Sequence, residues 1–193
     1  LQTIKLVFQY LEKSVKTADP EAREKMHNAS TMAGMAFANA FLGMSHSMAH
    51  KIGGVHHTVH GRTNAILLPY VIRYNGTRPS KTTTWPKYNY WKADEKFQDI
   101  AKMLGLPHST PEEAVEAYAK AVYDLGVAVG IKMNFKDQGI DEKTWKDSLH
   151  EIALLAYEDQ CSPANPRLPM VADMEEIMAD AYHGYAKKPG RRK

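Results

Sequence analysis

The sequence predicts an all-α protein, a bundle of helices with one irregular loop. Apolar residues recur at helical spacing along most of the 193 positions, and no stretch shows the alternation typical of a β-strand. Helix start signals, in which a capping residue precedes proline or acidic residues, recur between these segments. A hydrophobic content of 44% is sufficient for one domain with a buried core. We therefore expect residues 1–193 to form a single helical domain without internal repeats.

The predicted helices follow one another along the chain, each bounded by a recognisable signal. The first is already apolar from Ile4 to Leu11 and has no capping residue before it, so we expect the chain to be part of a longer polypeptide. Later starts are marked by Asp19 with Pro20, by Thr110 with Pro111, and by Asp141. A helix over residues 61–75 is expected to be kinked or interrupted at Pro69. The other predicted helices span residues 22–38, 39–51, 94–104, 114–130, 142–158 and 174–186.

Residues 76–93 differ in character from the rest of the chain. They contain two prolines, four threonines and four aromatic residues without any period, which predicts a loop. A connection of this length is typical of a functional segment, and its aromatic residues Trp85, Tyr88 and Tyr90 suit a contact with another chain or domain.

Composition excludes several classes of protein. Residues 187–193 contribute +5 to the net charge of +3, which leaves −2 for residues 1–186, so we expect a solvated basic tail and no nucleic-acid binding. No apolar run is long enough to span a membrane, and no signal peptide is recognisable. The single cysteine, Cys161, excludes an internal disulfide and favours a cytoplasmic location.

Histidines are concentrated in one short segment, which is the strongest indication of chemistry. Imidazole binds transition metals and changes charge near neutral pH, so this crowding points to a functional site. The adjacent residues His56 and His57 point in different directions, so we expect at least one of them to face solvent. Five of the nine histidines lie within fifteen residues: His46, His50, His56, His57 and His60.

Spacing alone leaves the roles of these histidines open. A helix over residues 39–51 places His46 and His50 four apart on one face. The sequence Ile52-Gly53-Gly54 predicts a helix stop and a chain reversal, which would bring His60 back toward His46. The pair suits two ligands of one metal, but it equally suits one ligand with a proton-relay partner one turn away. It is also compatible with ordinary core or surface histidines.

Common catalytic motifs are absent from the sequence. There is no glycine-rich phosphate loop, no Gly-x-Ser-x-Gly elbow and no His-Glu-x-x-His. Asp147 with His150, and Asp180 with His183, each place a carboxylate and an imidazole three positions apart. Because both pairs lie on amphipathic helices with many charges, we expect them to be surface pairs.

Taken together, several motifs resemble the iron-dependent (group III) alcohol dehydrogenases. They are Gly-Met-Ser-His-Ser-Met-Ala-His at 43–50, the fourteen-residue step from His46 to His60, the segment 64–75 and Asn-Pro-Arg at 165–167. Trp-Pro-Lys-Tyr-Asn-Tyr at 85–90, followed by residues 100–106, is more narrowly similar to the alcohol dehydrogenase half of bifunctional aldehyde–alcohol dehydrogenases. The resemblance covers essentially the whole chain and implies the helical C-terminal domain of the dehydroquinate synthase-like fold.

The resemblance also implies roles for three histidines. In that family one divalent metal is held by an Asp-x-x-x-His helix and two further histidines, which correspond here to His46 and His60. His50 corresponds to a histidine beside the nicotinamide and is a candidate proton relay. The Asp-x-x-x-His helix and the nucleotide-binding domain precede the residues that match Leu1, so we expect the chain alone to be inactive and NAD to bind mainly elsewhere. Iron is the expected metal, with Zn²⁺ as a possible replacement.

The implied reaction is the interconversion of acetaldehyde and ethanol. The metal would act as a Lewis acid on the alcohol, and a hydride would pass to NAD⁺. A homo-oligomer or filament is expected, because the bifunctional enzymes form filaments called spirosomes. Two alternatives are that the chain is an element of spirosome assembly, or that it is a non-catalytic metal-binding helical module.

Overall fold

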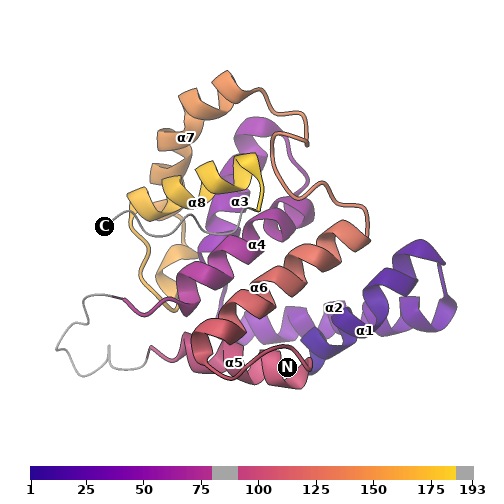
Figure 1. Cartoon of the computed structure of the whole chain (residues 1–193). Coiled ribbons are helices and arrows are strands. Elements are labelled where there is room, and N and C mark those ends of the chain that lie inside the picture. The colour runs from indigo at the N-terminus through magenta and orange to yellow at the C-terminus, as the bar shows by residue number, and fades with distance from the viewer. Residues whose placement is uncertain (80–90, 186–193) are drawn as a thin grey trace.

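The computed structural model describes residues 1–79 and 91–185, and this part of the chain is all-α, as predicted (Figure 1). Trp85, Tyr88, Tyr90 and the basic tail 187–193 lie outside the described residues. The helices of the described part are α1 (Gln2–Lys16), α2 (Pro20–Ala40), α3 (Met44–His56), α4 (His60–Gly76), α5 (Ala93–Met103), α6 (Pro111–Ala128), α7 (Glu142–Tyr157), the short 3₁₀ helix η2 (Ser162–Ala164) and α8 (Val171–His183).

Helix α4 lies at the centre and packs against α3, α5, α6 and α8 (Figure 1). Side chains of α4 belong to two different apolar clusters. One cluster joins α4 to α3, α7 and α8 and includes Phe135 and Trp145. The other joins α4 to α5 and α6 through Ile72, Ile100 and Val115. Helices α1 and α2 pair with each other as a hairpin at the side of the molecule. The α3–α4 pair, which carries the histidines, is therefore held by the larger cluster.

Three predicted helix starts are confirmed by side-chain caps. Asp19 accepts a hydrogen bond from the backbone N–H of Ala22 at 2.8 Å, and α2 begins at Pro20. Thr110 and Asp141 cap α6 and α7 in the same way, at 3.1 and 3.0 Å. These caps depend on neighbouring residues only, which is why the local sequence predicts them.

The predicted helix over residues 39–51 is wrong in its first part. Helix α2 ends at Ala40, and α3 begins only at Met44. Between them, Phe41 adopts a left-handed φ of 64°. The N–H of Met44 donates to Oδ1 of Asn165 at 3.3 Å, so a side chain 121 positions away helps to set the start of α3. This long-range contact has no signal in the local sequence.

The predicted stop at residues 52–54 is also wrong. Helix α3 continues through both glycines to His56, and the reversal takes place at His57, which has the left-handed φ of 54° and ψ of 34°. Ile52 is fully buried in the larger cluster. Burial of such a side chain contributes roughly 1.5–3 kcal/mol, whereas each helical glycine costs about 1 kcal/mol, so packing sustains the helix.

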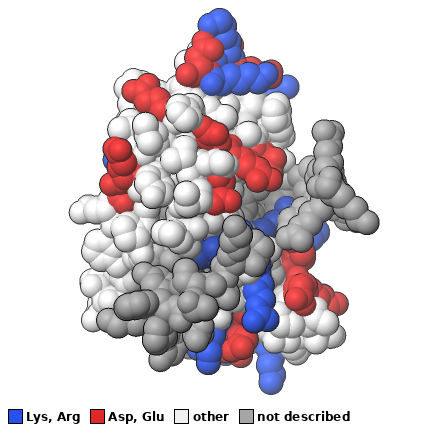
Figure 2. All heavy atoms as spheres, turned by 90° about the vertical axis from the view of Figure 1, so that its left-hand side faces the viewer, with Lys and Arg blue, Asp and Glu red and all other residues white. Residues whose placement is uncertain are grey.

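Helix α4 includes Pro69 and runs from His60 to Gly76 without interruption, so the expected interruption does not occur. Gly76 and Ala93, which were expected in the loop, instead belong to α4 and α5. Within the described ranges, no helix is sufficiently long and apolar to cross a membrane. Figure 2 shows one face of the molecule, on which acidic side chains gather in the upper half among uncharged residues and basic side chains lie at the top and in the lower half. The described part of this face therefore has mixed charge.

Candidate metal and proton-transfer site

Three histidines from two consecutive helices converge near the surface. His46 and His50 lie one turn apart on α3, and His60 is the first residue of α4. Their ring centroids are 6.1 Å apart for His46 and His50, 5.1 Å for His46 and His60, and 5.2 Å for His50 and His60. One ring nitrogen of each lies within 4.8 Å of the other two. The predicted return of His60 toward His46 is therefore observed, although the chain reverses later than predicted.

The turn between α3 and α4 fixes the position of His60. Buried Thr63 donates through Oγ1 to the backbone oxygen of Val59 at 3.1 Å, and this Oγ1 lies 2.7 Å from Oγ1 of Thr58. These contacts tie the turn to the first turn of α4. The position of His60 thus depends on a hydrogen-bonded connection rather than on a free loop.

His46 has the properties of an unprotonated ligand. Burial, together with the neighbouring His60 and His50, lowers the pKa of its imidazole, because each factor disfavours a positive charge. Its Nδ1 atom is buried and has no hydrogen-bond partner among the described residues. A buried nitrogen of this kind normally has a partner. The unpartnered nitrogen and the neighbouring imidazoles fit a divalent transition metal, for which neutral imidazole is a common ligand.

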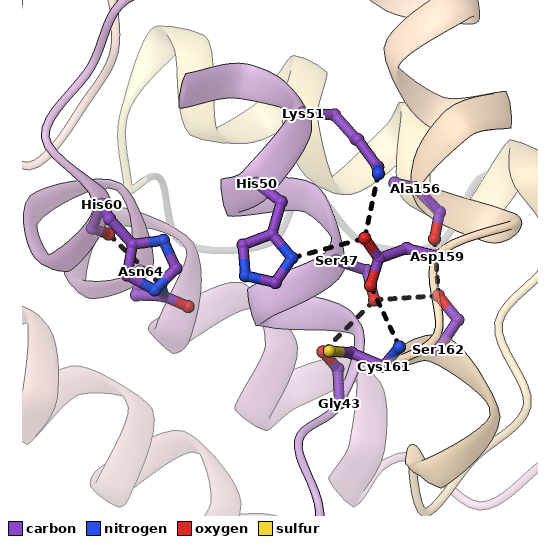
Figure 3. A network of polar contacts seen from close by, with 10 residues as sticks. All are labelled: Gly43, Ser47, His50, Lys51, His60, Asn64, Ala156, Asp159, Cys161 and Ser162. Carbon is purple, nitrogen blue, oxygen red and sulfur yellow. Dashed lines mark hydrogen bonds and ion pairs between the residues drawn. The ribbon is translucent and has the colours of Figure 1, made fainter. Parts of the chain in front are cut away.

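His60 is oriented by two polar neighbours. Nδ2 of Asn64, one turn along α4, lies 3.2 Å from Nε2 of His60 (Figure 3). Oδ1 of Asn64 accepts a hydrogen bond from Ser45 of α3 at 2.9 Å. Ser45 therefore holds the Asn64 amide, and Asn64 holds the imidazole. An amide nitrogen can only donate, so Nε2 of His60 is the acceptor in this arrangement, and a metal at Nε2 would displace Asn64.

His50 is held on its other side by a carboxylate. Oδ2 of Asp159 lies 3.3 Å from Nδ1 of His50 and 3.0 Å from Nζ of Lys51 (Figure 3). Burial favours the neutral form of Asp159, but hydrogen bonds from Cys161, Lys51 and His50 outweigh it and hold the pKa of this carboxyl well below its usual range. The carboxylate is therefore ionised at neutral pH.

Asp159 is the site residue that sequence reasoning missed. Its segment, Asp-Gln-Cys-Ser-Pro at 159–163, has the proline typical of a rigid turn and matches no catalytic motif. Oγ of Ser162 donates to the backbone oxygen of Ala156 at 2.6 Å and lies 3.0 Å from Oγ of Ser47 on α3 (Figure 3). This contact anchors the turn directly beneath the histidines. The sequence signal was an acidic residue beside a cysteine and a proline, which is too common to point to a site.

The other histidines lie apart from this cluster. Nε2 of His56 is 3.0 Å from Oγ of Ser148, and its ring packs against Trp145. His57 is exposed, as expected for one member of the adjacent pair. The predicted pairing of Asp147 with His150 is wrong, because Asp147 pairs with Lys143 and His150 with Glu175. His183 is exposed, as predicted, but no hydrogen bond or ion pair joins its side chain to Asp180 among the described residues.

The fold and the sequence together define the class of protein. Residues 1–182 match the "Fe-containing alcohol dehydrogenase family, C-terminal". The structure is similar to that of 1,3-propanediol oxidoreductase, with a TM-score of 0.79 and 33% identity over 94% of this chain and 44% of that one. The chain therefore belongs to the iron-containing alcohol dehydrogenase family and corresponds to its C-terminal part.

Individual relatives show which enzymes within this family the chain resembles more closely. The chain is 77% identical over its whole length to an aldehyde-alcohol dehydrogenase of Streptococcus pneumoniae serotype 2. It is 57% identical, over 96% of its length, to aldehyde-alcohol dehydrogenase 2 of Entamoeba histolytica. It spans only 22% and 21% of the lengths of these two relatives. The resemblance to the bifunctional enzymes, inferred from the motifs, is thus confirmed.

Proposed function

We propose that this chain is the metal-binding helical part of an iron-type, NAD-linked alcohol dehydrogenase that interconverts acetaldehyde and ethanol. The observation that carries the proposal is the convergence of His46, His50 and His60 within 4.8 Å of one another. Family membership and the high identity to two aldehyde-alcohol dehydrogenases support the substrate class. The chain spans about a fifth of the length of these relatives, so the activity is proposed for a protein that also contains their remaining parts.

In this proposal His46 and His60 are the metal ligands that the chain contributes. Lowering of the His46 pKa keeps its imidazole neutral, which metal binding requires. Two imidazoles make only part of a coordination sphere, so the other ligands come from outside residues 1–193. When bound, a divalent metal supplies Lewis acidity that favours loss of the alcohol proton. Iron is the proposed ion, and zinc is a replacement because nitrogen and oxygen sites bind it more tightly.

His50 is proposed to move the proton rather than to bind the metal. Its Nδ1 faces Asp159, and the opposite edge of its ring faces His60 (Figure 3). The His50 side chain is exposed, so a proton accepted at its inner edge can pass to water. The ring thus lies between the histidine cluster and Asp159, and part of its surface is open to solvent. NAD is proposed to bind mainly through the nucleotide-binding part that precedes this chain in the family.

Activity and metal content of the protein at its natural full length test this proposal. We expect about one metal ion per chain and NADH-dependent reduction of acetaldehyde. His46→Ala and His60→Ala should each lose both, whereas His50→Ala should keep the metal and lose most of the turnover. His27→Ala, an exposed histidine of α2, is the matched control and should change neither. Retention of metal and activity in the His46 and His60 variants would overturn the ligand assignment.

Assembly into a cytoplasmic homo-oligomer or filament is a separate proposal. It is supported by the resemblance to filament-forming enzymes and by the aromatic segment at residues 85–90. Replacing Trp85, Tyr88 and Tyr90 together by alanine should abolish filaments in electron micrographs and leave dehydrogenase activity intact. Unchanged filaments would show that this segment is not part of the interface between subunits.

A further inference from the structure

We propose that Asp159 is a positioning residue that fixes the tautomer and the orientation of His50, so that Nδ1 carries the proton and Nε2 faces the histidine cluster. The inference rests on the proposed function of His50 as a proton relay. Its basis is an independent set of contacts, made by a turn that lies more than a hundred positions away in the sequence. Asp159 touches neither substrate nor metal in this account and acts only through His50.

The carboxylate is placed too firmly to be an incidental surface neighbour. Its side chain is only 7% exposed, although the His50 side chain that it contacts is 36% exposed. Oδ1 accepts a hydrogen bond from the N–H of Cys161 at 3.0 Å, which holds the plane of the carboxylate. Oδ2 is left to face His50 and Lys51 together. A carboxylate fixed at both oxygens presents one defined acceptor to the ring.

The ionised state of Asp159 determines which nitrogen of His50 carries hydrogen. A carboxylate can only accept hydrogen bonds, so the favourable contact requires a proton on Nδ1. In the neutral imidazole, Nε2 then has the free lone pair. This nitrogen lies on the edge of the ring that faces His60 (Figure 3). With the opposite tautomer, two acceptors would face each other across 3.3 Å, and the relay nitrogen would be blocked by its own hydrogen.

The proton balance follows directly from this tautomer. During alcohol oxidation, Nε2 accepts the hydroxyl proton, and His50 becomes an imidazolium whose Nδ1–H remains bonded to Asp159. Nε2 then releases the same proton to water, and the neutral tautomer is restored. Asp159 stays ionised throughout and stabilises the positive ring. In the reduction of the aldehyde, Nε2 first takes a proton from water and then gives it to the product oxygen, which restores the neutral tautomer.

The same neighbourhood offers a competing interpretation as a metal site. One ligand atom each of His50, Asp159 and Cys161 lies within 4.8 Å of the other two. Two observations favour the hydrogen-bonded arrangement. The ammonium of Lys51 already provides a positive charge at Oδ2 of Asp159. Burial and the hydrogen bond to Asp159 raise the pKa of the Cys161 thiol, and a protonated thiol is a poor metal ligand.

The test is a double-mutant cycle between Asp159→Asn and His50→Ala, measured on the natural full-length enzyme. Asparagine preserves the shape of the side chain but offers both a donor and an acceptor, so it no longer selects one tautomer. We expect Asp159→Asn to lower kcat by about 10–100-fold, with the KM for acetaldehyde and the metal content unchanged. In the His50→Ala background, the same change should lower kcat by less than about twofold, because Asp159 acts through His50.

Two further variants separate positioning from general support of the fold. Asp159→Glu keeps the charge and should restore part of the turnover lost in Asp159→Asn. Glu158→Gln removes the adjacent, exposed carboxylate and should leave kcat unchanged. The inference would be overturned if the kcat losses of the two single variants multiply in the double variant. It would also be overturned if Asp159→Asn left kcat unchanged. Loss of metal in Asp159→Asn would also overturn it, in favour of the metal interpretation.

Failure of this inference can be distinguished from failure of the proposed function. If the His46→Ala and His60→Ala enzymes keep metal and activity, the proposed function is wrong. If those variants behave as expected but Asp159→Asn retains normal turnover, only the role of Asp159 is wrong.

Discussion

Nδ1 of His50 lies 3.3 Å from Oδ2 of Asp159, although the two residues are 109 positions apart. The contact joins α3 to the turn that follows α7, and it places a charged group directly behind the histidine cluster. Lys51, the next residue of α3, contacts the same oxygen at 3.0 Å. Two successive residues of one helix thus share one carboxylate, which couples the stability of this turn to the geometry of the site.

The first prediction concerns the pH dependence of stability. Because the pKa of Asp159 is lowered in the folded state, its ionisation stabilises the fold above the unfolded carboxyl pKa of about 3.9. This contribution is lost as pH falls below about 4. Urea unfolding of the 193-residue chain between pH 3 and 7 should therefore show that wild type exceeds Asp159→Asn in stability at pH 7 and that the difference shrinks in acid. A difference independent of pH would contradict this explanation.

The second prediction concerns the close approach of the Asn165 side chain to the backbone at Gly43. A Cβ atom at this position would lie 2.8 Å from Oδ1 of Asn165, the atom that accepts the N–H of Met44. Gly43→Ala should therefore displace Asn165 and destabilise the chain by about 1–3 kcal/mol.

The matched control for that substitution is Gly34→Ala in α2, where an added Cβ meets nothing within 4 Å. It should stabilise the chain by about 0.5–1 kcal/mol, since alanine is the better helix former. Thermal unfolding of the two variants should shift in opposite directions. If both substitutions shifted the unfolding temperature in the same direction and by the same amount, Asn165 would not constrain Gly43.

The third prediction concerns the orientation of His60. Asn64→Ala removes the amide that lies 3.2 Å from Nε2 of His60 and that is held by Ser45. The amide donates to the lone pair of Nε2 and so competes with a metal for it, and we expect the metal affinity of the full-length protein to rise by about 2–5-fold. Competition with a zinc chelator measures this change. Asn28→Ala, at an exposed position of α2, is the control, and unchanged or lower affinity in Asn64→Ala would contradict this role of Asn64.

Those parts of the fold that depend on local chemistry are predictable from the sequence. The caps at Asp19, Thr110 and Asp141 each bind a backbone N–H three residues away, so the start of the helix is encoded within one turn. The spacing of His46 and His50 likewise places both on one face of α3. Their proximity to His60 requires only that the chain reverses soon after α3. It does not depend on the exact residue at which the chain reverses.

The features that sequence reasoning missed depend on distant partners. The separation of α2 from α3 involves Asn165, and the extension of α3 through two glycines depends on burial of Ile52. The turn that carries Asp159 is held on α3 by the contact of Ser162 with Ser47 and by the ion pair of Asp159 with Lys51. His150 pairs with Glu175 of α8 rather than with Asp147, since α7 and α8 pack together. None of these contacts leaves a periodic or local signature in the chain.

The most direct test of the central claim is an anomalous-difference map at the iron edge, from crystals of the natural full-length protein loaded with Fe²⁺. The account predicts one peak per chain, bonded at about 2.0–2.2 Å to a ring nitrogen of His46 and a ring nitrogen of His60. Nδ1 of His50 should remain on Asp159 and away from the peak. A peak bonded instead to His50, Asp159 and Cys161, or one that touches neither His46 nor His60, would contradict the account.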